Sequence, residues 1–305
     1  MGMTGSRTIT LGSRPSKLAR WQTDHIRARL QAAWPGLTCQ VVTLVTEGDK
    51  TIDRPLPEIG GKGVFTADLD LALRSGEIDL AVHSLKDLPV EDTPGLCIGA
   101  VSQRADAHDA LISARGWKLA GLPQGARVGT SSLRREAQLK AARPDLVILP
   151  LRGNVDTRVR KAMAGEYDAV VLAFAGLERL GLANEIAETL PFDVMLPAPG
   201  QGALAVTCRL GDQRMLDLLQ PIHDQATWRT VACERAFLAA LGAGCSAPVA
   251  AYAETRGSSI EVSGLVASID GQRVVRVCAR GEDGALLGGW LAQLALQEGA
   301  WALLQ

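Results

Sequence analysis

The stretch VGTSSLRREAQLKAARPDLVILPLRGNVDTRVRK, residues 128–161, decides the fold class of this chain. It predicts a strand, a helix, a second strand and a second helix, joined by polar turns. Arg134 and Arg135 stand at the start of the first helix, and Arg152 and Arg158 near the start of the second. Ligands of α/β sheets collect where strands end and helices begin, and helix N-termini favour anions. Paired arginines there indicate a ligand with several carboxylates or phosphates, which suit the fork geometry of guanidinium groups.

Length and composition are those of an ordinary globular protein with room for two or three domains. The chain has 305 residues, of which 47% are hydrophobic and 21% charged, and its net charge is -1. A polyanionic partner such as DNA is therefore not indicated. Only seven of the 32 basic residues are lysines. A GC-rich genome would explain the excess of arginine, but it does not predict that arginines cluster at turns.

The six cysteines are scattered, with no C-x-x-C pair and no histidine spacing typical of zinc. We expect no metal, and no disulfide framework in a chain of this size. No apolar segment is long enough to cross a membrane, and the N-terminus shows no secretory h-region. These features predict a cytoplasmic protein with reduced thiols.

Short apolar runs alternate with amphipathic segments, which predicts βαβ units and largely parallel sheets. LPAPGQGALAV (196–206) is interpreted as a crossing back into the first domain, and from about Pro221 the pattern changes to α+β. A segment from Thr46 to Lys62 is either a mobile lid or a disordered loop, because typical connections have about 4–6 residues. The expected domains are residues 1–102 with 200–220 (α/β), 103–199 (α/β) and 221–305 (α+β).

HSLKDLP (83–89) follows a strand predicted over residues 78–83. Its Lys86–Asp87 pair is either a solvated turn or part of a cleft in which Asp87 faces the arginines. In the second interpretation Asp87 is ionised, and it is then a poor proton donor and a good stabiliser of a cation. His83 is interpreted as a strand residue rather than a catalyst.

The turns GTSSLRR (129–135) and LRGNVDTR (151–158) are anion sites if they line one cleft. Otherwise they are helix caps, because Ser and Thr commonly cap helices. Two such turns after neighbouring strands favour the anion site. GSRPS is a third comparable turn, with Arg14 and Ser16, and AGLERLG adds Arg179.

GAGCSAPV (242–249) places Cys245 in a Gly-rich turn between a helix and a strand. Its G-x-G-x-x-A string follows a helix rather than a strand, so dinucleotide binding is rejected. Cys245 is either an inert small hydrophobic residue or an exposed reactive thiol. GGKGV (60–64) is not a P-loop, because Gly63 stands at the Ser/Thr position, and a phosphotransferase is not favoured.

Eight motifs, in this order along the chain, closely resemble the porphobilinogen deaminase (hydroxymethylbilane synthase) family: TITLGSRPSKLA, GGKGVFT, DLAVHSLKDLP, GTSSLRR, LRGNVDTR, AGLERLG, LPAPGQGALAV and GCSAPV. The resemblance spans about residues 8–250 and is specific as a set, and beyond 250 it is one of general pattern. It implies two type II periplasmic-binding-protein-like (transferrin-like) α/β domains and a small α+β C-terminal domain.

The resemblance also implies roles for single residues. Cys245 matches the cysteine that carries a covalent dipyrromethane cofactor through a thioether, and Asp87 matches the catalytic aspartate. Further matched positions are cofactor contacts at Ser84, Lys86, Ser132, Arg134 and Arg135, and substrate contacts at Arg14, Ser16, Arg152, Arg158 and Arg179.

The implied reaction condenses four porphobilinogen molecules head to tail on the dipyrromethane primer, releases ammonia at each step and ends in hydrolysis to hydroxymethylbilane. Such an enzyme is a transferase of porphyrin and heme biosynthesis. We expect a cytoplasmic monomer with a small-molecule substrate and no nucleic-acid or membrane partner. The alternative is a binding protein for a small polycarboxylate or oxyanion on the same fold, which explains the arginines but not a reactive Cys245 in a third domain.

The chain departs from the family pattern at two positions. Ala243 stands in LGAGC where many relatives have a second glycine, so the turn is strained if its backbone needs a positive φ. Thr207 stands in ALAVTC where an acid is common. Neither residue is assigned a chemical role.

Overall fold

The computed structural model describes residues 7–46, 66–244 and 247–304. These residues form two compact units, Met1–Arg104 with Ala203–Thr227, and Ala105–Gly202 with Trp228–Gln305. Except for Thr46, the segment expected to be a lid or loop lies outside the described residues, and so does Cys245.

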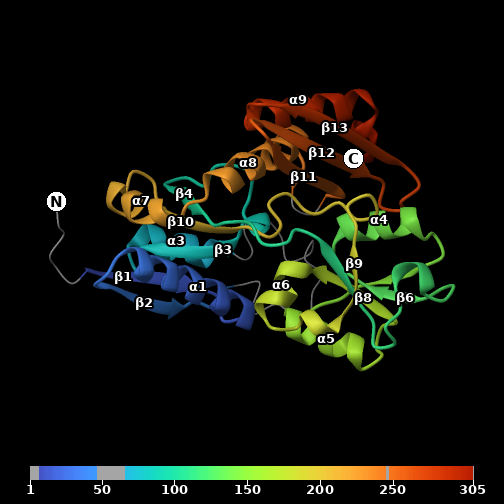
Figure 1. Cartoon of the computed structure of the whole chain (residues 1–305), viewed down its shortest axis with the longest axis horizontal. Coiled ribbons are helices and arrows are strands. Elements are labelled where there is room, and N and C mark those ends of the chain that lie inside the picture. The colour runs from blue at the N-terminus through green and yellow to red at the C-terminus, as the bar shows by residue number, and fades with distance from the viewer. Residues whose placement is uncertain (1–6, 47–65, 245–246, 305) are drawn as a thin grey trace. The chain divides into compact units, whose positions relative to one another are not determined.

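The first unit is built on a five-stranded sheet in the order β2-β1-β3-β10-β4 (Figure 1). Its strands are β1 (Arg7–Ser13), β2 (Leu37–Thr43), β3 (Leu80–Ser84), β4 (Leu96–Val101) and β10 (Leu204–Arg209). β1 runs parallel to β2 and β3, whereas β10 runs antiparallel to both β3 and β4. The chain thus returns to this sheet at β10, within the stretch 196–206 that was interpreted as a crossing back into the first domain.

Helices cover both faces of this sheet. They are α1 (Lys17–Ala33), α3 (Ala67–Ser75) and α7 (Gln213–Leu219). Ile26 of α1 shares a core with Leu11 of β1, and Leu69 of α3 shares a separate core with Ala81 of β3. Gly76 ends α3 at φ 79°, a left-handed conformation that glycine adopts without a steric penalty.

The second unit contains a five-stranded sheet in the order β7-β6-β8-β5-β9. Its strands are β5 (Asp109–Ile112), β6 (Arg127–Gly129), β7 (Val147–Leu149), β8 (Ala169–Ala173) and β9 (Ile186–Leu190), and its helices are α4 (Leu133–Ala142), α5 (Val155–Met163) and α6 (Phe174–Arg179). β6 runs parallel to β7 and β8, and β5 runs antiparallel to β8 and β9. The strand, helix, strand and helix predicted over residues 128–161 are confirmed as β6, α4, β7 and α5.

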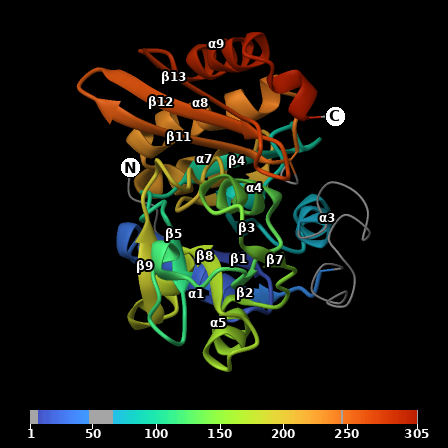
Figure 2. The same cartoon turned by 90° about the vertical axis from the view of Figure 1, so that its right-hand side faces the viewer.

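A three-stranded antiparallel sheet, β11-β12-β13, completes the second unit (Figure 2). Its elements are β11 (Val249–Arg256), β12 (Ser259–Ala267), β13 (Val274–Gly281), α8 (Gln225–Ala240) and α9 (Gly284–Gln297). Both helices pack on one face, because a Cβ on Gly264 of β12 would lie 2.6 Å from Phe237 of α8 and 3.0 Å from Leu291 of α9. β11 is the strand expected after the turn that carries Cys245, although its bounds were not predicted from the sequence.

The predicted fold class is confirmed. Each α/β sheet places one reversed strand, β10 or β5, beside the third parallel strand, as in type II periplasmic-binding-protein-like domains, and the C-terminal part is a small α+β sheet. The division into three domains stays a prediction. Within the second unit, Ala137 of α4 packs against Ala250 and Leu265, so the α/β sheet and the C-terminal sheet share a core.

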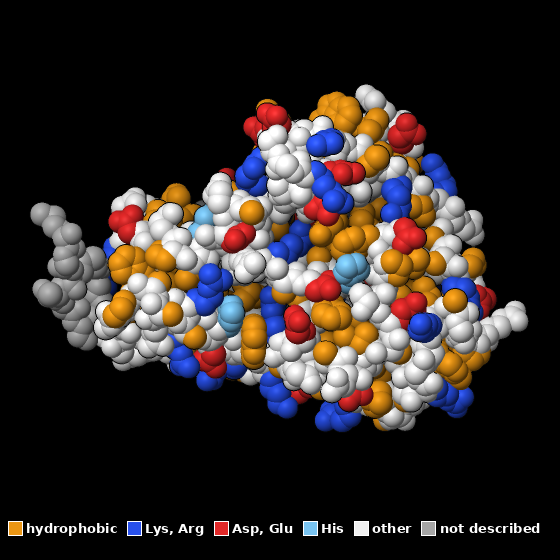
Figure 3. All heavy atoms as spheres, viewed as in Figure 1, with side chains coloured by type: hydrophobic (Ala, Val, Ile, Leu, Met, Phe, Trp, Pro, Cys, Tyr) orange, Lys and Arg blue, Asp and Glu red, His pale blue; other side chains and the backbone are white. Residues whose placement is uncertain are grey.

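On the face drawn in Figure 3, acidic and basic side chains are interspersed and form no continuous basic surface. This mixture agrees with the net charge of -1. In the described part of the chain, no helix is both long and apolar enough to cross a membrane.

Candidate active site

A pocket of the first unit lies where β1 and β3 end. Four predicted residues line it, Arg14, Ser16, Ser84 and Asp87, around a cavity of about 70 Å³. β1 and β3 are parallel neighbours, so the turns that follow them emerge at the same edge of the sheet. Lys86 is the middle residue of the 3₁₀ turn η2 (Leu85–Asp87), which directly follows Ser84.

Hydrogen bonds fix two walls of this pocket. Ser16 Oγ accepts from Ala19 N at 3.2 Å, so Ser16 does cap α1. Gln22 is only 3% exposed and its Nε2 donates to Ser84 Oγ at 2.9 Å. Asp87 is exposed, so its carboxylate is open to a ligand. Gln22 was not predicted as a site residue, although a glutamine on the buried face of an amphipathic helix is a signal for a buried polar contact.

His83 is the fourth residue of β3 and is buried at 6% exposure. Burial, and secondarily the charge of Arg14, lower its pKa to about 4, so its imidazole is neutral at pH 7. Its Nε2 lies 3.2 Å from Thr207 Oγ1. Thr207 thus gives His83 a neutral hydrogen-bonding partner and no counter-charge.

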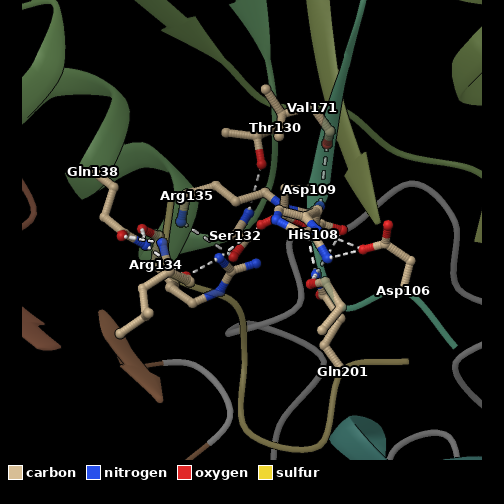
Figure 4. Close-up of polar contacts among 12 residues, drawn as sticks. Asp106, His108, Asp109, Thr130, Ser132, Arg134, Arg135, Gln138, Val171 and Gln201 are labelled. Carbon is tan, nitrogen blue, oxygen red and sulfur yellow. Dashed lines mark hydrogen bonds and ion pairs between the residues drawn. The ribbon is translucent and has the colours of Figure 1, made fainter. Parts of the chain in front are cut away.

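A buried ion-pair cluster of Asp109, Arg134 and Arg135 lies at the start of α4 in the second unit (Figure 4). Arg135 donates to Asp109 Oδ1 from Nε at 3.2 Å and from Nη2 at 2.7 Å. Arg134 Nη1 lies 2.8 Å from Asp109 Oδ2, in ion-pair contact without hydrogen-bond geometry, and donates to Leu196 O at 2.7 Å. The structure therefore brings the two predicted arginines together around a carboxylate that the sequence analysis had not identified.

The charges of this cluster do not cancel. Asp109 is fully buried, and Arg134 and Arg135 are 4% and 6% exposed. Burial alone would raise the Asp109 pKa, but the two guanidinium groups hold it below its usual range, so Asp109 is ionised. Burial lowers the pKa of Arg134, although Asp109 opposes that effect. Two cations and one anion leave one positive charge, and a carboxylate ligand is the chemistry that would balance it.

Neighbouring polar groups fix this cluster in place. Gln201 Nε2 donates to Asp109 Oδ1 at 2.9 Å, and Arg135 Nη1 donates to Val171 O at 3.1 Å. Ser132 caps α4, because its Oγ accepts from Arg135 N at 3.4 Å. Asp109 could have been suspected from sequence as a charged residue that directly precedes the buried run ALI, whereas nothing local indicated its partners.

Three other predicted arginines lie in the second unit and are half-buried. Arg152 lies in the turn between β7 and α5, where Arg158 Nε donates to Gly153 O at 2.7 Å. Arg179 ends α6, and its Nη2 donates to Gly202 O at 2.6 Å. Burial lowers the pKa of Arg179 to about 10, and Glu178 opposes the shift, so Arg179 stays charged at pH 7.

The turn that carries Cys245 is described up to Gly244 and again from Ala247. No described residue other than glycine has a positive φ, so the backbone at Ala243 does not show the strain considered above. Gly242, with φ 63°, supplies the left-handed conformation after α8. The assignment of Cys245 itself stays a prediction.

An α/β fold with a carboxylate and a guanidinium in one pocket, and a second cluster with surplus positive charge, defines a protein that binds an anionic small molecule. Comparison with known proteins gives the family. The model "Porphobilinogen deaminase, dipyromethane cofactor binding domain" matches residues 9–217, and "Porphobilinogen deaminase, C-terminal domain" matches residues 228–297.

Curated relatives agree over nearly the whole chain. The porphobilinogen deaminase of Roseiflexus castenholzii is 51% identical over 97% of this chain and 98% of its own. The porphobilinogen deaminase of Moorella thermoacetica is 48% identical over 97% of this chain and 96% of its own. That of Geobacter metallireducens is 44% identical over 98% of this chain and 94% of its own. The chain belongs to the porphobilinogen deaminase family. It is accordingly an enzyme of the transferase class with a dipyrromethane cofactor-binding domain.

Proposed function

We propose that this enzyme condenses four porphobilinogen molecules head to tail and hydrolyses the product to hydroxymethylbilane, with Asp87 as the catalytic residue. The observation that carries the proposal is the pocket that holds both Asp87 and Arg14. Porphobilinogen carries a cationic aminomethyl group and two carboxylates, so it needs one group of each sign. The pocket offers an anionic and a cationic side chain at one edge of the first sheet.

Asp87 acts through its charge. The aminomethyl group has an amine pKa near that of lysine, about 10.4, and is therefore protonated at neutral pH. It leaves as ammonia without a strong acid from the protein. The azafulvenium cation that remains on the substrate is stabilised by the exposed carboxylate of Asp87 near the ring N–H. His83 is neutral and buried, and it adds no charge to this step.

The arginines bind the acetate and propionate groups. Arg14 and Ser16 do so in the first unit, and Arg152, Arg158 and Arg179 in the second. A hydrogen bond to a charged group contributes about 1.5–3 kcal/mol, so several arginines must share a ligand of this charge. The half-buried position of these arginines in the second unit lowers the local dielectric and strengthens each contact.

A dipyrromethane carries four carboxylates and two pyrrole N–H groups, and each unit offers groups that suit part of it. The surplus positive charge of the Asp109 cluster suits a carboxylate, and the Asp87 carboxylate suits the N–H groups. We propose that Cys245 holds the group covalently, and that the remaining contacts come from Ser84, Lys86, Ser132, Arg134 and Arg135. When bound, the group supplies the pyrrole carbon to which the first substrate is joined.

We further propose that the enzyme is a cytoplasmic monomer whose partner is the small-molecule substrate alone. The test of the activity is direct. Purified protein is incubated with porphobilinogen, and ammonia and uroporphyrin are measured, the latter by absorbance after oxidation. Four ammonias per uroporphyrin would support the proposal. Saturable binding of porphobilinogen with no ammonia would instead support the alternative, a polycarboxylate-binding protein on the same fold.

A further inference from the structure

Two cysteines oppose each other across the β4–β10 pair of the first unit. Cys97 and Cys208 are direct partners in the antiparallel register, and their Sγ atoms lie 3.7 Å apart. Both are free thiols. Among the five cysteines that the structure describes, no other pair has its sulfur atoms in contact.

The backbone already suits a disulfide at this position. Directly opposed residues of antiparallel strands have Cα atoms about 4.5–5.5 Å apart. Disulfides form at Cα separations of about 4.4–6.8 Å with an S–S bond of about 2.05 Å. Side-chain rotation is therefore enough to close the gap, with no shift of the strands. Cys208 Sγ lies against Gly99, where a Cβ would be 3.0 Å away.

The two thiols differ in access. Cys97 is half-buried and Cys208 is fully buried. Burial, and then the neighbouring Cys97, raise the pKa of Cys208 to about 12, so Cys208 remains a thiol at neutral pH. A dissolved oxidant therefore reacts first at Cys97, and Cys208 is positioned to attack the oxidised sulfur.

We propose that Cys97 and Cys208 form a reversible oxidation site, which hydroperoxides convert to an intramolecular disulfide. The peroxide transfers one oxygen to Cys97, giving a sulfenic acid and one water. The Cys208 sulfur then bonds to the Cys97 sulfur, and the departing hydroxide takes the Cys208 proton to form a second water. In total two thiols lose two electrons and the peroxide gains them. A thiol reductant reverses the change by exchange.

The bridge would form beside the active-site strand. β10 also pairs with β3, where Leu204 is opposite Ser84 and Ala205 opposite His83. A bond at Cys208 therefore links β4 covalently to the strand that supports one wall of the pocket. The oxidation site nevertheless stands on its own geometry and does not depend on the proposed function.

The test is differential alkylation of the holoenzyme. Native protein is treated with hydrogen peroxide, denatured in N-ethylmaleimide and digested, and the peptides are analysed by mass spectrometry. We expect loss of alkylation at Cys97 and Cys208 together, and a cross-linked peptide that disappears with dithiothreitol. Two independently alkylated residues, or a sulfinic acid at Cys97 with Cys208 still alkylated, would overturn the proposal.

Variants distinguish the Cys97–Cys208 disulfide from other products of cysteine oxidation. Cys97→Ser should abolish the cross-link and leave Cys208 alkylated, because Cys208 is then shielded from the oxidant. Cys39→Ser, a change at a half-buried cysteine of the same sheet, should leave the cross-link intact. Cys278 is exposed and can form a disulfide between two protein molecules. Such a disulfide gives a dimer on a non-reducing gel, and this dimer should be absent in Cys278→Ser. A cross-link that persists in Cys97→Ser would also contradict the proposal.

Discussion

Asp109 Oδ1 accepts two hydrogen bonds from one side of Arg135, from Nε at 3.2 Å and Nη2 at 2.7 Å. The other carboxylate oxygen lies 2.8 Å from Arg134 Nη1. A single fully buried carboxylate thus orients both guanidinium groups at the start of α4. The Asp109 carboxylate neutralises only one of the two guanidinium groups, so the cluster retains one positive charge for a ligand. It also avoids two buried cations without a counter-ion.

Asp109→Asn should strongly destabilise the second unit. Removing one partner of a buried ion pair typically costs about 3–5 kcal/mol, because it leaves an uncompensated buried charge. Urea unfolding followed by circular dichroism measures the loss. The matched control is Asp145→Asn, an ion pair with Arg143 in which both side chains are only half-buried, and a smaller loss is expected there. Equal stability of the two variants would contradict the structural role of Asp109.

Asp87→Asn should keep the fold and the cofactor and lose most of the turnover. Asparagine is nearly isosteric with aspartate but cannot stabilise a cation by charge. The rate of porphobilinogen consumption measures the effect, with Asp92→Asn, an exposed acid of the same loop, as the control. A variant that retained more than about a tenth of the wild-type rate, a barrier change of roughly 1.4 kcal/mol, would exclude the electrostatic role.

Local signals predicted the elements of the fold and failed where partners are distant in sequence. The stretch 196–206 indicated a crossing back into the first domain, but the strand β10 that starts in it and the antiparallel direction of that strand were not predicted. Arg134 and Arg135 were identified from a helix start. Their counter-ion Asp109 lies 26 residues from Arg135, and only the packing of β5 beside β8 brings them together. The contact of Gln22 with Ser84 was missed for the same reason.

Arg152→Leu and Arg158→Leu should impair substrate binding or elongation more than folding. Both residues are half-buried, Arg152 in the turn before α5 and Arg158 in α5, and the charged hydrogen bond from Arg158 to Gly153 O contributes at most about 1.5–3 kcal/mol. Native mass spectrometry after a porphobilinogen pulse should show trapped partial-chain complexes. The control is Arg160→Leu, at an exposed arginine of α5, and it should give no trapped partial-chain complexes. Loss of soluble protein in the first two variants would count against this prediction.

His83 should make stability depend on pH. Its pKa is about 4 in the folded chain and about 6.5 when unfolded, so the unfolded chain binds more protons between these values. Its contribution is therefore fully present above about pH 6.5 and is lost as the pH falls toward 4. From pH 7 to pH 5 the loss reaches roughly 2 kcal/mol. Urea unfolding of the wild type and of His83→Gln at both pH values tests this prediction. The free energy of unfolding should fall less on acidification in the variant, and an equal fall in both proteins would contradict the role of His83.

The last prediction concerns where the cofactor is attached. If Cys245 carries the dipyrromethane, the purified enzyme should be heavier than its sequence by two porphobilinogen units less two ammonias, and Ehrlich's reagent should colour it. Reductants should not remove the mass, because a thioether is not a disulfide. Cys245→Ser should lose both the mass and the activity, since a hydroxyl is a weaker nucleophile toward the azafulvenium.

The other cysteines provide the controls for this assignment. Burial raises the pKa of both Cys208 and Cys233 to about 12, and it raises that of Cys39 as well, so these thiols react poorly with an electrophile that arrives from solution at neutral pH. If Cys245 is the attachment site, replacing any other cysteine by Ala or Ser should leave the added mass in place. These cysteines are Cys39, Cys97, Cys208, Cys233 and Cys278. Peptide mapping that located the adduct on one of them, or found none on active enzyme, would refute both the attachment site and the primer mechanism that depends on it.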